Sequence, residues 1–184
     1  MQLTRTLINK LKRVKLIVSD VDGVLTDGKI YLDGSTEESK AFSAKDAIPM
    51  EMAMRSGLKI VWFTGRKCQA VIRRSQEITG VKLLFKGDLY WRRQNLFSQL
   101  IKVYKIKPAE ILYIGDDLND LFFMRQAGVA VTPQNGSVEN KKVADIITRA
   151  NGGEGVMAEV IRMVLGTQGT WERQQKAYAT QFLF

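Results

Sequence analysis

The stretch Val14-Lys15-Leu16-Ile17-Val18-Ser19-Asp20-Val21-Asp22-Gly23-Val24-Leu25-Thr26 decides the fold of this chain. It begins with a short aliphatic, β-branched run over 14–18, and acidic and small residues follow at once. Such a run is typical of a buried parallel strand. In an open α/β sheet, ligands bind beyond the carboxyl ends of the strands, where Asp20 and Asp22 then fall.

Two more runs of the same kind are followed by polar residues. Residues 58–63 lead into Thr64-Gly65-Arg66, and residues 111–114 lead into Gly115-Asp116-Asp117-Leu118-Asn119-Asp120. Weaker strands are predicted over 82–85, 129–131 and 144–148, and helices over 49–56, 69–79, 90–104 and 118–126. The alternation predicts an α/β fold with a doubly wound, Rossmann-like parallel sheet.

One segment interrupts this alternation. Strand-like residues 29–32 and 37–42 flank a turn at Asp33-Gly34-Ser35, which predicts an inserted β-hairpin flap near the end of the first strand. The chain of 184 residues, 45% hydrophobic and 26% charged, is expected to form a single domain over 1–184 with its core over 14–166. The tail over 167–184 is expected either to fray or to dock on a neighbouring subunit.

Charge and composition limit the chemistry. The absence of His excludes imidazole as a base or ligand, and the single Cys68 excludes an internal disulfide. No apolar stretch approaches the roughly 20 residues that cross a bilayer, so we expect a cytoplasmic protein without a membrane partner. The formal charge of +9 raises the possibility of nucleic-acid binding, but the basic residues are scattered, and we expect no nucleic-acid partner.

The acidic residues at the predicted strand ends suggest a metal site. Five carboxylates on two strand ends would repel one another in a partly desolvated cleft unless a cation lay between them. Hard oxygen ligands without His or thiolate favour Mg²⁺. These carboxylates belong to Asp20, Asp22, Asp116, Asp117 and Asp120.

Such a site can support phosphoryl transfer. Asp20 is placed to act as a nucleophile, and Asp22, two residues on, suits a general acid and then base. Backbone N–H groups after Asp20, helped by Gly23, and the Thr64 hydroxyl could hold phosphoryl oxygens, with a Lys or Arg completing the charge clamp.

The segments Asp20–Gly28, Phe63–Arg66 and Gly115–Asp120, in that order and spacing, resemble the haloacid-dehalogenase superfamily of phosphatases. The match is closer to its small group without a cap domain, which comprises 3-deoxy-D-manno-octulosonate 8-phosphate phosphatases and nonulosonate 9-phosphate phosphatases. The likeness runs from about Lys15 to Glu172. It implies an Mg²⁺-dependent hydrolase without a cap domain, a role in lipopolysaccharide biosynthesis, and a homotetramer in which neighbours close the site.

By position, the resemblance implies Asp20 as the nucleophile and Asp22 as the acid/base, with Mg²⁺ held by Asp20, the Asp22 carbonyl and Asp116. For Asp117 and Asp120, helix capping and support of Asp116 are equally weighted alternatives. Implied substrate contacts come from Ser43, Lys45, Asp46, Arg66 and Arg74. Without the resemblance, Lys45, Arg66 and Arg74 could equally well be ordinary solvated charges on the surface.

The chain departs from the group's pattern at three places. Residues 46–49 read Asp-Ala-Ile-Pro instead of Asp-Gly-x-Gly, and Glu51 stands near the usual place of a basic residue. Trp91 occupies the position of the group's lysine. A two-residue insertion would give that role to Arg93, with Arg92 and Lys86 as rivals.

The sequence therefore predicts a phosphomonoester hydrolase that forms an aspartyl-phosphate and acts on a phosphorylated acidic sugar. The first candidate is 3-deoxy-D-manno-octulosonate 8-phosphate, and a nonulosonate 9-phosphate is the alternative. A non-catalytic oligomeric module that partners a sugar-nucleotide enzyme is the alternative of another class.

Overall fold

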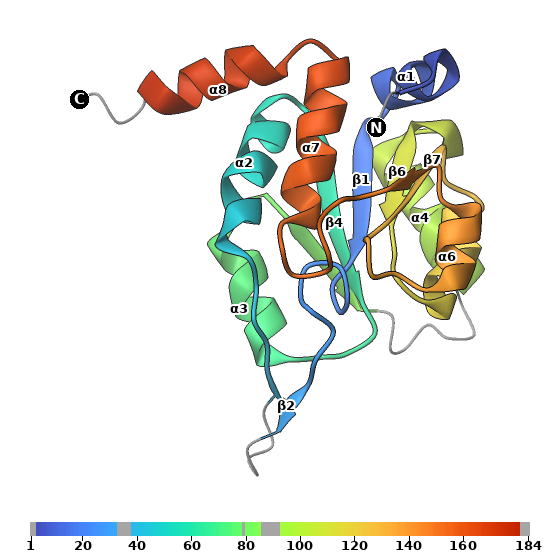
Figure 1. The fold of residues 1–184 in the computed structure, drawn as a ribbon, viewed down its shortest axis with the longest axis vertical. Coiled ribbons are helices and arrows are strands. Elements are labelled where there is room, and N and C mark those ends of the chain that lie inside the picture. The colour runs from blue at the N-terminus through green and yellow to red at the C-terminus, as the bar shows by residue number, and fades with distance from the viewer. Residues whose placement is uncertain (1–2, 33–37, 79, 86–92, 181–184) are drawn as a thin grey trace.

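A six-stranded parallel sheet forms the centre of the molecule (Figure 1). The computed structural model describes residues 3–32, 38–78, 80–85 and 93–180, with the backbone alone over 93–96. The strand order is β5-β4-β1-β6-β7-β8, which confirms the predicted doubly wound α/β sheet. The strands are β1 Leu16–Asp20, β4 Lys59–Thr64, β5 Lys82–Phe85, β6 Ile111–Ile114, β7 Val129–Thr132 and β8 Ile146–Ile147.

Side chains that alternate along each strand pack into two cores. Ile17 and Trp62 face the core covered by α1, α2, α3 and α7, whereas Val18, Val61 and Phe63 face the core covered by α4 and α5. Strands buried on both faces explain why the sequence shows continuous apolar runs. The helices are α1 Arg5–Lys12, α2 Ala47–Arg55, α3 Gln69–Glu77, α4 Arg93–Tyr104, α5 Leu121–Met124, α6 Val138–Val143, α7 Val156–Thr167 and α8 Trp171–Thr180, with 3-10 turns η1 Ala44–Asp46, η3 Pro108–Glu110 and η4 Leu118–Asp120.

The structure shifts some predicted boundaries and adds helices. The first strand begins at Leu16 and extends to Asp20, two residues beyond the predicted run, so Asp20 belongs to the strand itself. Within the described residues, α1, α6, α7 and α8 were not predicted. Helix α1 was not predicted because it is short and mostly polar on its exposed face. Its apolar residues Leu7 and Leu11 lie one turn apart and face the core.

The predicted hairpin is present as β2 Tyr31–Leu32 and β3 Glu38–Ser39, an antiparallel pair. The hairpin projects beyond the carboxyl ends of the parallel strands (Figure 1). Its predicted turn at 33–35 lies outside the described residues. Between the parallel strands, the part of the chain that the structure describes contains no inserted cap domain.

Within the predicted tail, residues 171–180 form helix α8, which packs on α2 and α7 of its own chain. The Arg162 guanidinium carbon lies 4.7 Å from the centre of the Trp171 ring, and that of Arg55 lies 5.8 Å from the centre of the Tyr178 ring. These contacts place cations over aromatic faces at both ends of the helix. No described helix combines the length and the apolarity that a membrane span requires.

Candidate active site

The carboxyl ends of two neighbouring strands supply the acidic side chains of a cleft. Asp20 is the last residue of β1, and Asp116 follows β6, which pairs directly with β1. The cleft has a volume of about 540 Å³. Its lining residues come mainly from the loops after β1, β4 and β6, and they are Asp20, Asp22, Gly28, Gly65, Arg66, Asp116, Asp117, Leu118 and Asn119.

Three carboxylates converge in a way that suits a metal ion. One oxygen each of Asp20, Asp116 and Asp120 lie within 4.8 Å of one another, and Asp20 and Asp120 are buried. Such close like charges need a compensating cation when they are shielded from water. Because every donor is a hard oxygen, the cluster fits Mg²⁺ or a similar divalent ion.

Asp120 is held from two sides. The Tyr113 hydroxyl donates to Asp120 Oδ1 at 2.8 Å, and the Asp116 N–H donates to Asp120 Oδ2 at 3.1 Å. Burial, together with the charge of Asp120, raises the pKa of the Tyr113 phenol well above its usual value, so the phenol remains a donor. Asp117 has a different environment, since its Oδ1 accepts the Leu118 N–H at 2.7 Å and caps η4.

The loop after β1 is organised by Thr26, for which the sequence alone predicted no role. The buried Thr26 hydroxyl accepts the N–H groups of Gly23 and Gly28 at 3.4 and 3.3 Å. Gly23 has a φ of +85°, and a Cβ at this position would lie 1.9 Å from Asp116 Oδ2. The loop can therefore approach the aspartate cluster only because residue 23 lacks a side chain.

A second loop supports the first from behind. Gly153 N–H donates to the Val24 carbonyl at 3.0 Å, and a Cβ at Gly152 would lie 1.9 Å from the Gly23 carbonyl oxygen. The segment over 151–155 is thus packed against the loop after β1 of its own chain.

Thr64 ends β4 next to Asp20 but is engaged locally. Its hydroxyl accepts the Arg66 N–H at 3.1 Å and lies 3.3 Å from the Arg66 carbonyl oxygen, to which it donates. These bonds shape the turn that presents Arg66 to the cleft.

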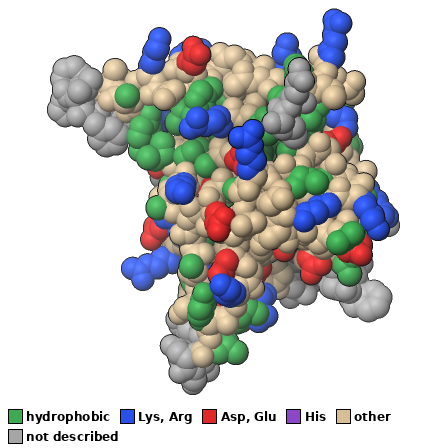
Figure 2. Space-filling model, in the orientation of Figure 1, with side chains coloured by type: hydrophobic (Ala, Val, Ile, Leu, Met, Phe, Trp, Pro, Cys, Tyr) green, Lys and Arg blue, Asp and Glu red, His purple; other side chains and the backbone are tan. Residues whose placement is uncertain are grey.

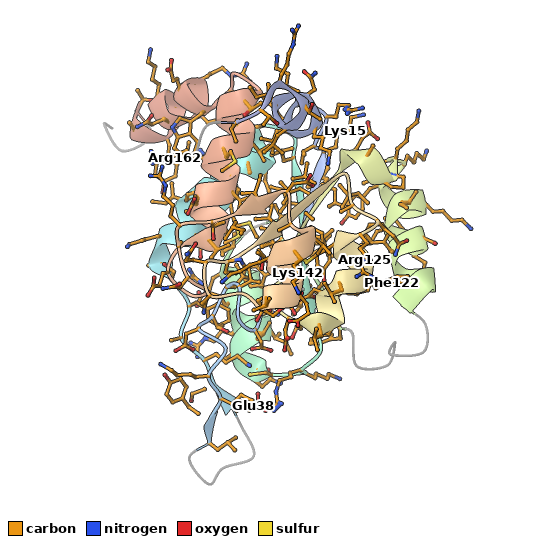
Figure 3. The ribbon with its side chains drawn as sticks, turned by 45° about the vertical axis from the view of Figure 1, so that its right-hand side comes forward. Lys15, Glu38, Phe122, Arg125, Lys142 and Arg162 are labelled. Carbon is orange, nitrogen blue, oxygen red and sulfur yellow. The ribbon has the colours of Figure 1, made fainter. Side chains whose placement is uncertain are left out.

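The hairpin contributes two charged residues, Glu38 and Lys40, that were not predicted as site residues. Lys40 Nζ donates to Asp22 Oδ1, and Glu38 accepts the Arg66 guanidinium through Nη2 at 2.8 Å and Nε at 3.3 Å. Figure 3 shows Glu38 on the hairpin below the body of the molecule. No sequence pattern signals these pairs, because they join residues that only the folded hairpin brings together.

Asp46 and Lys45 lie at the start of α7, and the cleft lining includes none of the predicted contacts Ser43, Lys45, Asp46 and Arg74. Asp46 is buried and its Oδ1 accepts the Ala158 N–H at 2.8 Å, so it caps α7 from another part of the chain. Burial raises the Asp46 pKa to about 6, although the Ala158 N–H and the charge of Arg74 oppose the rise. Ser43 Oγ accepts the Lys45 N–H at 3.3 Å, and Arg74 donates to Glu77 at 2.8 Å.

The candidates for the phosphate-clamping cation are not placed by the structure. Arg93 begins α4, but its side chain is not described. Arg92 and Lys86 lie outside the described residues.

Comparison with known proteins identifies the family. A family model for haloacid dehalogenase-like hydrolases matches residues 93–160. The 3-deoxy-D-manno-octulosonate 8-phosphate phosphatase of Escherichia coli K12 is 35% identical over 162 residues, which cover 88% of this chain and 85% of that protein. This chain belongs to the haloacid-dehalogenase family. Within that family it is a phosphatase.

Solved structures of similar phosphatases contain divalent metals. The 3-deoxy-D-manno-octulosonate 8-phosphate phosphatase of Moraxella catarrhalis, in complex with magnesium, phosphate and KDO, superimposes with a TM-score of 0.86 at 32% identity, covering 93% of this chain and 97% of that one. A cobalt-bound phosphatase of Haemophilus influenzae gives a TM-score of 0.78 at 28% identity, covering 87% of this chain and 92% of that one. The aspartate cluster of the present phosphatase fits the same kind of ion.

Proposed function

We propose that this phosphatase hydrolyses 3-deoxy-D-manno-octulosonate 8-phosphate with Mg²⁺, through an aspartyl-phosphate on Asp20. The observation that carries the proposal is the convergence of Asp20, Asp116 and Asp120 at one cleft that Arg66 also lines. The substrate is that of the similar Escherichia coli and Moraxella catarrhalis enzymes.

The metal would be held by Asp20, Asp116 and the Asp22 carbonyl oxygen, with Asp117 and Asp120 in support. When bound, Mg²⁺ supplies charge neutralisation for the carboxylates and the phosphoryl oxygens. The bonds from Tyr113 and from the Asp116 N–H orient Asp120 in this cluster.

Asp20 attacks phosphorus while the bond between phosphorus and the sugar oxygen breaks. Asp22 donates a proton to that departing oxygen. Asp22 then takes a proton from water, whose oxygen attacks phosphorus and releases Asp20 and inorganic phosphate. Val21 N–H already donates to Asp20 Oδ1 at 2.7 Å and fixes the nucleophile. Gly23 and Thr64 remain the proposed contacts of the phosphoryl oxygens. To make this contact, the Thr64 hydroxyl would donate to a phosphoryl oxygen instead of the Arg66 carbonyl oxygen.

The remaining parts of the proposal concern substrate and assembly. Arg66 is placed to meet an anionic sugar at the cleft, and Ser43, Lys45, Asp46 and Arg74 are further proposed contacts. Arg93, Arg92 or Lys86 would supply the phosphate clamp. We also propose one domain over 1–184 that acts as a cytoplasmic homotetramer in lipopolysaccharide biosynthesis.

Phosphate release tests the proposal. The wild-type chain with Mg²⁺ is expected to prefer the eight-carbon sugar phosphate over a nonulosonate 9-phosphate, and Asp20→Asn is expected to lose roughly 10³-fold or more in kcat because the nucleophile is lost. Glu110→Gln is the control: Glu110 precedes the amino end of β6, whereas the cleft lies at the carboxyl ends of the strands, and glutamine keeps an acceptor for the Lys107 N–H.

Equal turnover by Asp20→Asn would remove the nucleophile assignment. Preference for the nine-carbon substrate would redirect the proposal to the nonulosonate phosphatases. If the wild type binds Mg²⁺ but hydrolyses neither sugar phosphates nor 4-nitrophenyl phosphate, a non-catalytic module becomes the better description.

A further inference from the structure

Lys40 is a basic side chain in an unusual environment. It follows β3 of the hairpin, and its side chain is 0% exposed, whereas lysine normally keeps its ammonium in water. Its Nζ donates to Asp22 Oδ1 and lies 3.7 Å from Glu38 Oε2. A buried ammonium persists only when carboxylates compensate its lost hydration, so these two contacts hold Lys40 in place.

The contacts of Lys40 belong to a chain of alternating charges. Asp22 pairs with Lys40, Lys40 lies near Glu38, and Glu38 pairs with Arg66 through two hydrogen bonds. The Cys68 thiol donates to the Glu38 carbonyl oxygen at 3.3 Å. The hairpin is thereby linked to the loop after β1, which carries Asp22, and to the loop after β4, which carries Arg66.

This arrangement restricts the side chain of Asp22 through its contact with Lys40. Asp22 lies in the loop after β1, and its side chain is 25% exposed at the cleft. The ammonium of Lys40 donates to Asp22 Oδ1 and thereby favours one orientation of the carboxyl group. An acid that must reach the leaving oxygen loses efficiency when its carboxyl group is displaced by about an ångström.

We propose that Lys40 is a positioning residue for the reaction: it acts through Asp22, aligning that carboxyl group for proton transfer to the leaving oxygen. Lys40 itself does not touch the substrate. The hairpin therefore serves the chemistry of its own chain. This inference rests on the proposed function, in which Asp22 is the acid.

The test compares two leaving groups. A sugar alkoxide needs a proton as it departs, whereas 4-nitrophenolate leaves readily without one. Lys40→Met, which keeps the stem and removes the charge, is expected to lower kcat/KM for the best sugar phosphate by roughly 10²-fold, the lower part of the usual contribution of a general acid. For 4-nitrophenyl phosphate the loss is expected to stay within about threefold. kcat/KM is used because it reports only steps up to phosphoryl transfer to Asp20.

Two further variants separate positioning from a loss of structure. Lys40→Arg keeps the charge and is expected to recover part of the sugar-phosphate activity. Lys29→Met removes an exposed lysine from the same hairpin region, where it pairs only at the surface with Asp27, and is expected to leave both rates unchanged. If Lys40→Met does not fold, Lys40→Gln, which keeps a donor, takes its place.

Equal losses for both leaving groups in a folded Lys40 variant would overturn the inference, as would full sugar-phosphate activity. In either case a wild-type enzyme that hydrolyses both substrates leaves the proposed function intact. A wild type that hydrolyses neither would instead end the proposed function and the inference together.

Discussion

Gly23 lies where the loop after β1 passes directly beside the Asp116 carboxylate. Its φ of +85° is a conformation that residues with side chains avoid, and a Cβ would stand 1.9 Å from Asp116 Oδ2. Any substitution at residue 23 therefore has two separate costs: backbone strain, and displacement of an Asp116 oxygen in the proposed metal site. Gly57 carries only the first, since its φ is +93° and a Cβ there would meet no heavy atom within 4 Å.

This pair gives a matched prediction. Gly23→Ala and Gly57→Ala are each expected to lose about 1–2 kcal/mol of unfolding free energy from left-handed backbone strain. Only Gly23→Ala is expected to raise the Mg²⁺ concentration for half-maximal activity, by roughly 10-fold or more, because Asp116 must move. Urea unfolding and Mg²⁺ titration of phosphate release measure the two effects. Equal Mg²⁺ dependence in the two variants would contradict the close approach of Gly23 and Asp116.

Helix α7 shows how one element depends on a distant residue. Its N-cap position is Gly155, which has no side chain, and the buried Asp46 supplies the cap by accepting the Ala158 N–H. Residues 46 and 158 are 112 positions apart, so no local pattern reveals the cap. The cost is a carboxylate removed from water, and burial therefore raises the Asp46 pKa to about 6.

The raised pKa predicts how stability depends on pH. Between about pH 4 and pH 6 the folded chain holds a proton on Asp46 that the unfolded chain has released, so this group's contribution to stability is lost as pH rises through about 6. The change from 3.8 to about 6 corresponds to at most about 3 kcal/mol. Relative to Asp46→Asn, the wild type is expected to lose up to that amount between about pH 4 and pH 7, measured by urea unfolding.

Asp27→Asn is the control for this measurement. The Lys29 N–H lowers the Asp27 pKa, so this exposed carboxyl contributes stability that is lost as pH falls, the opposite direction. A flat difference between the wild type and Asp46→Asn would show that burial does not perturb Asp46.

Strand cores and their acidic ends could be predicted because each is a local property. The runs at 58–63 and 111–114 are apolar in every residue but Lys59, because both faces of the sheet are covered. The position of Asp20 and Asp116 at the ligand-binding ends of the strands follows from strand direction alone. The pairing of Lys40 with Asp22 and the capping by Asp46 could not be predicted, because they depend on how the hairpin and α7 pack. Helix α7 itself was missed because the glycine-rich 152–155 segment before it is typical of a loop.

The surface of the whole molecule differs in how charged and apolar side chains are distributed among the described residues. Lysine and arginine side chains are dispersed over the face shown in Figure 2, as expected for solvated charges, and they form no continuous basic groove among the residues described there. Among the exposed apolar residues, three are consecutive at the start of the hairpin: Ile30, Tyr31 and Leu32 are 44%, 48% and 73% exposed. Consecutive exposed apolar residues on a projecting element are typical of a contact surface.

The proposed homotetramer makes this surface testable. Light scattering is expected to give four times the 20.8 kDa chain mass for the wild type, and the double variant Tyr31→Asp, Leu32→Asp is expected to give a smaller species, because charges replace the side chains that would be buried between subunits. Folding should be unaffected, since these side chains are exposed within one chain. Val103→Asp, an equally apolar and exposed position on α4 at 62%, should keep the wild-type mass. A monomeric wild type at micromolar concentration, or a hairpin variant that keeps the full mass, would contradict a role of the hairpin in subunit assembly.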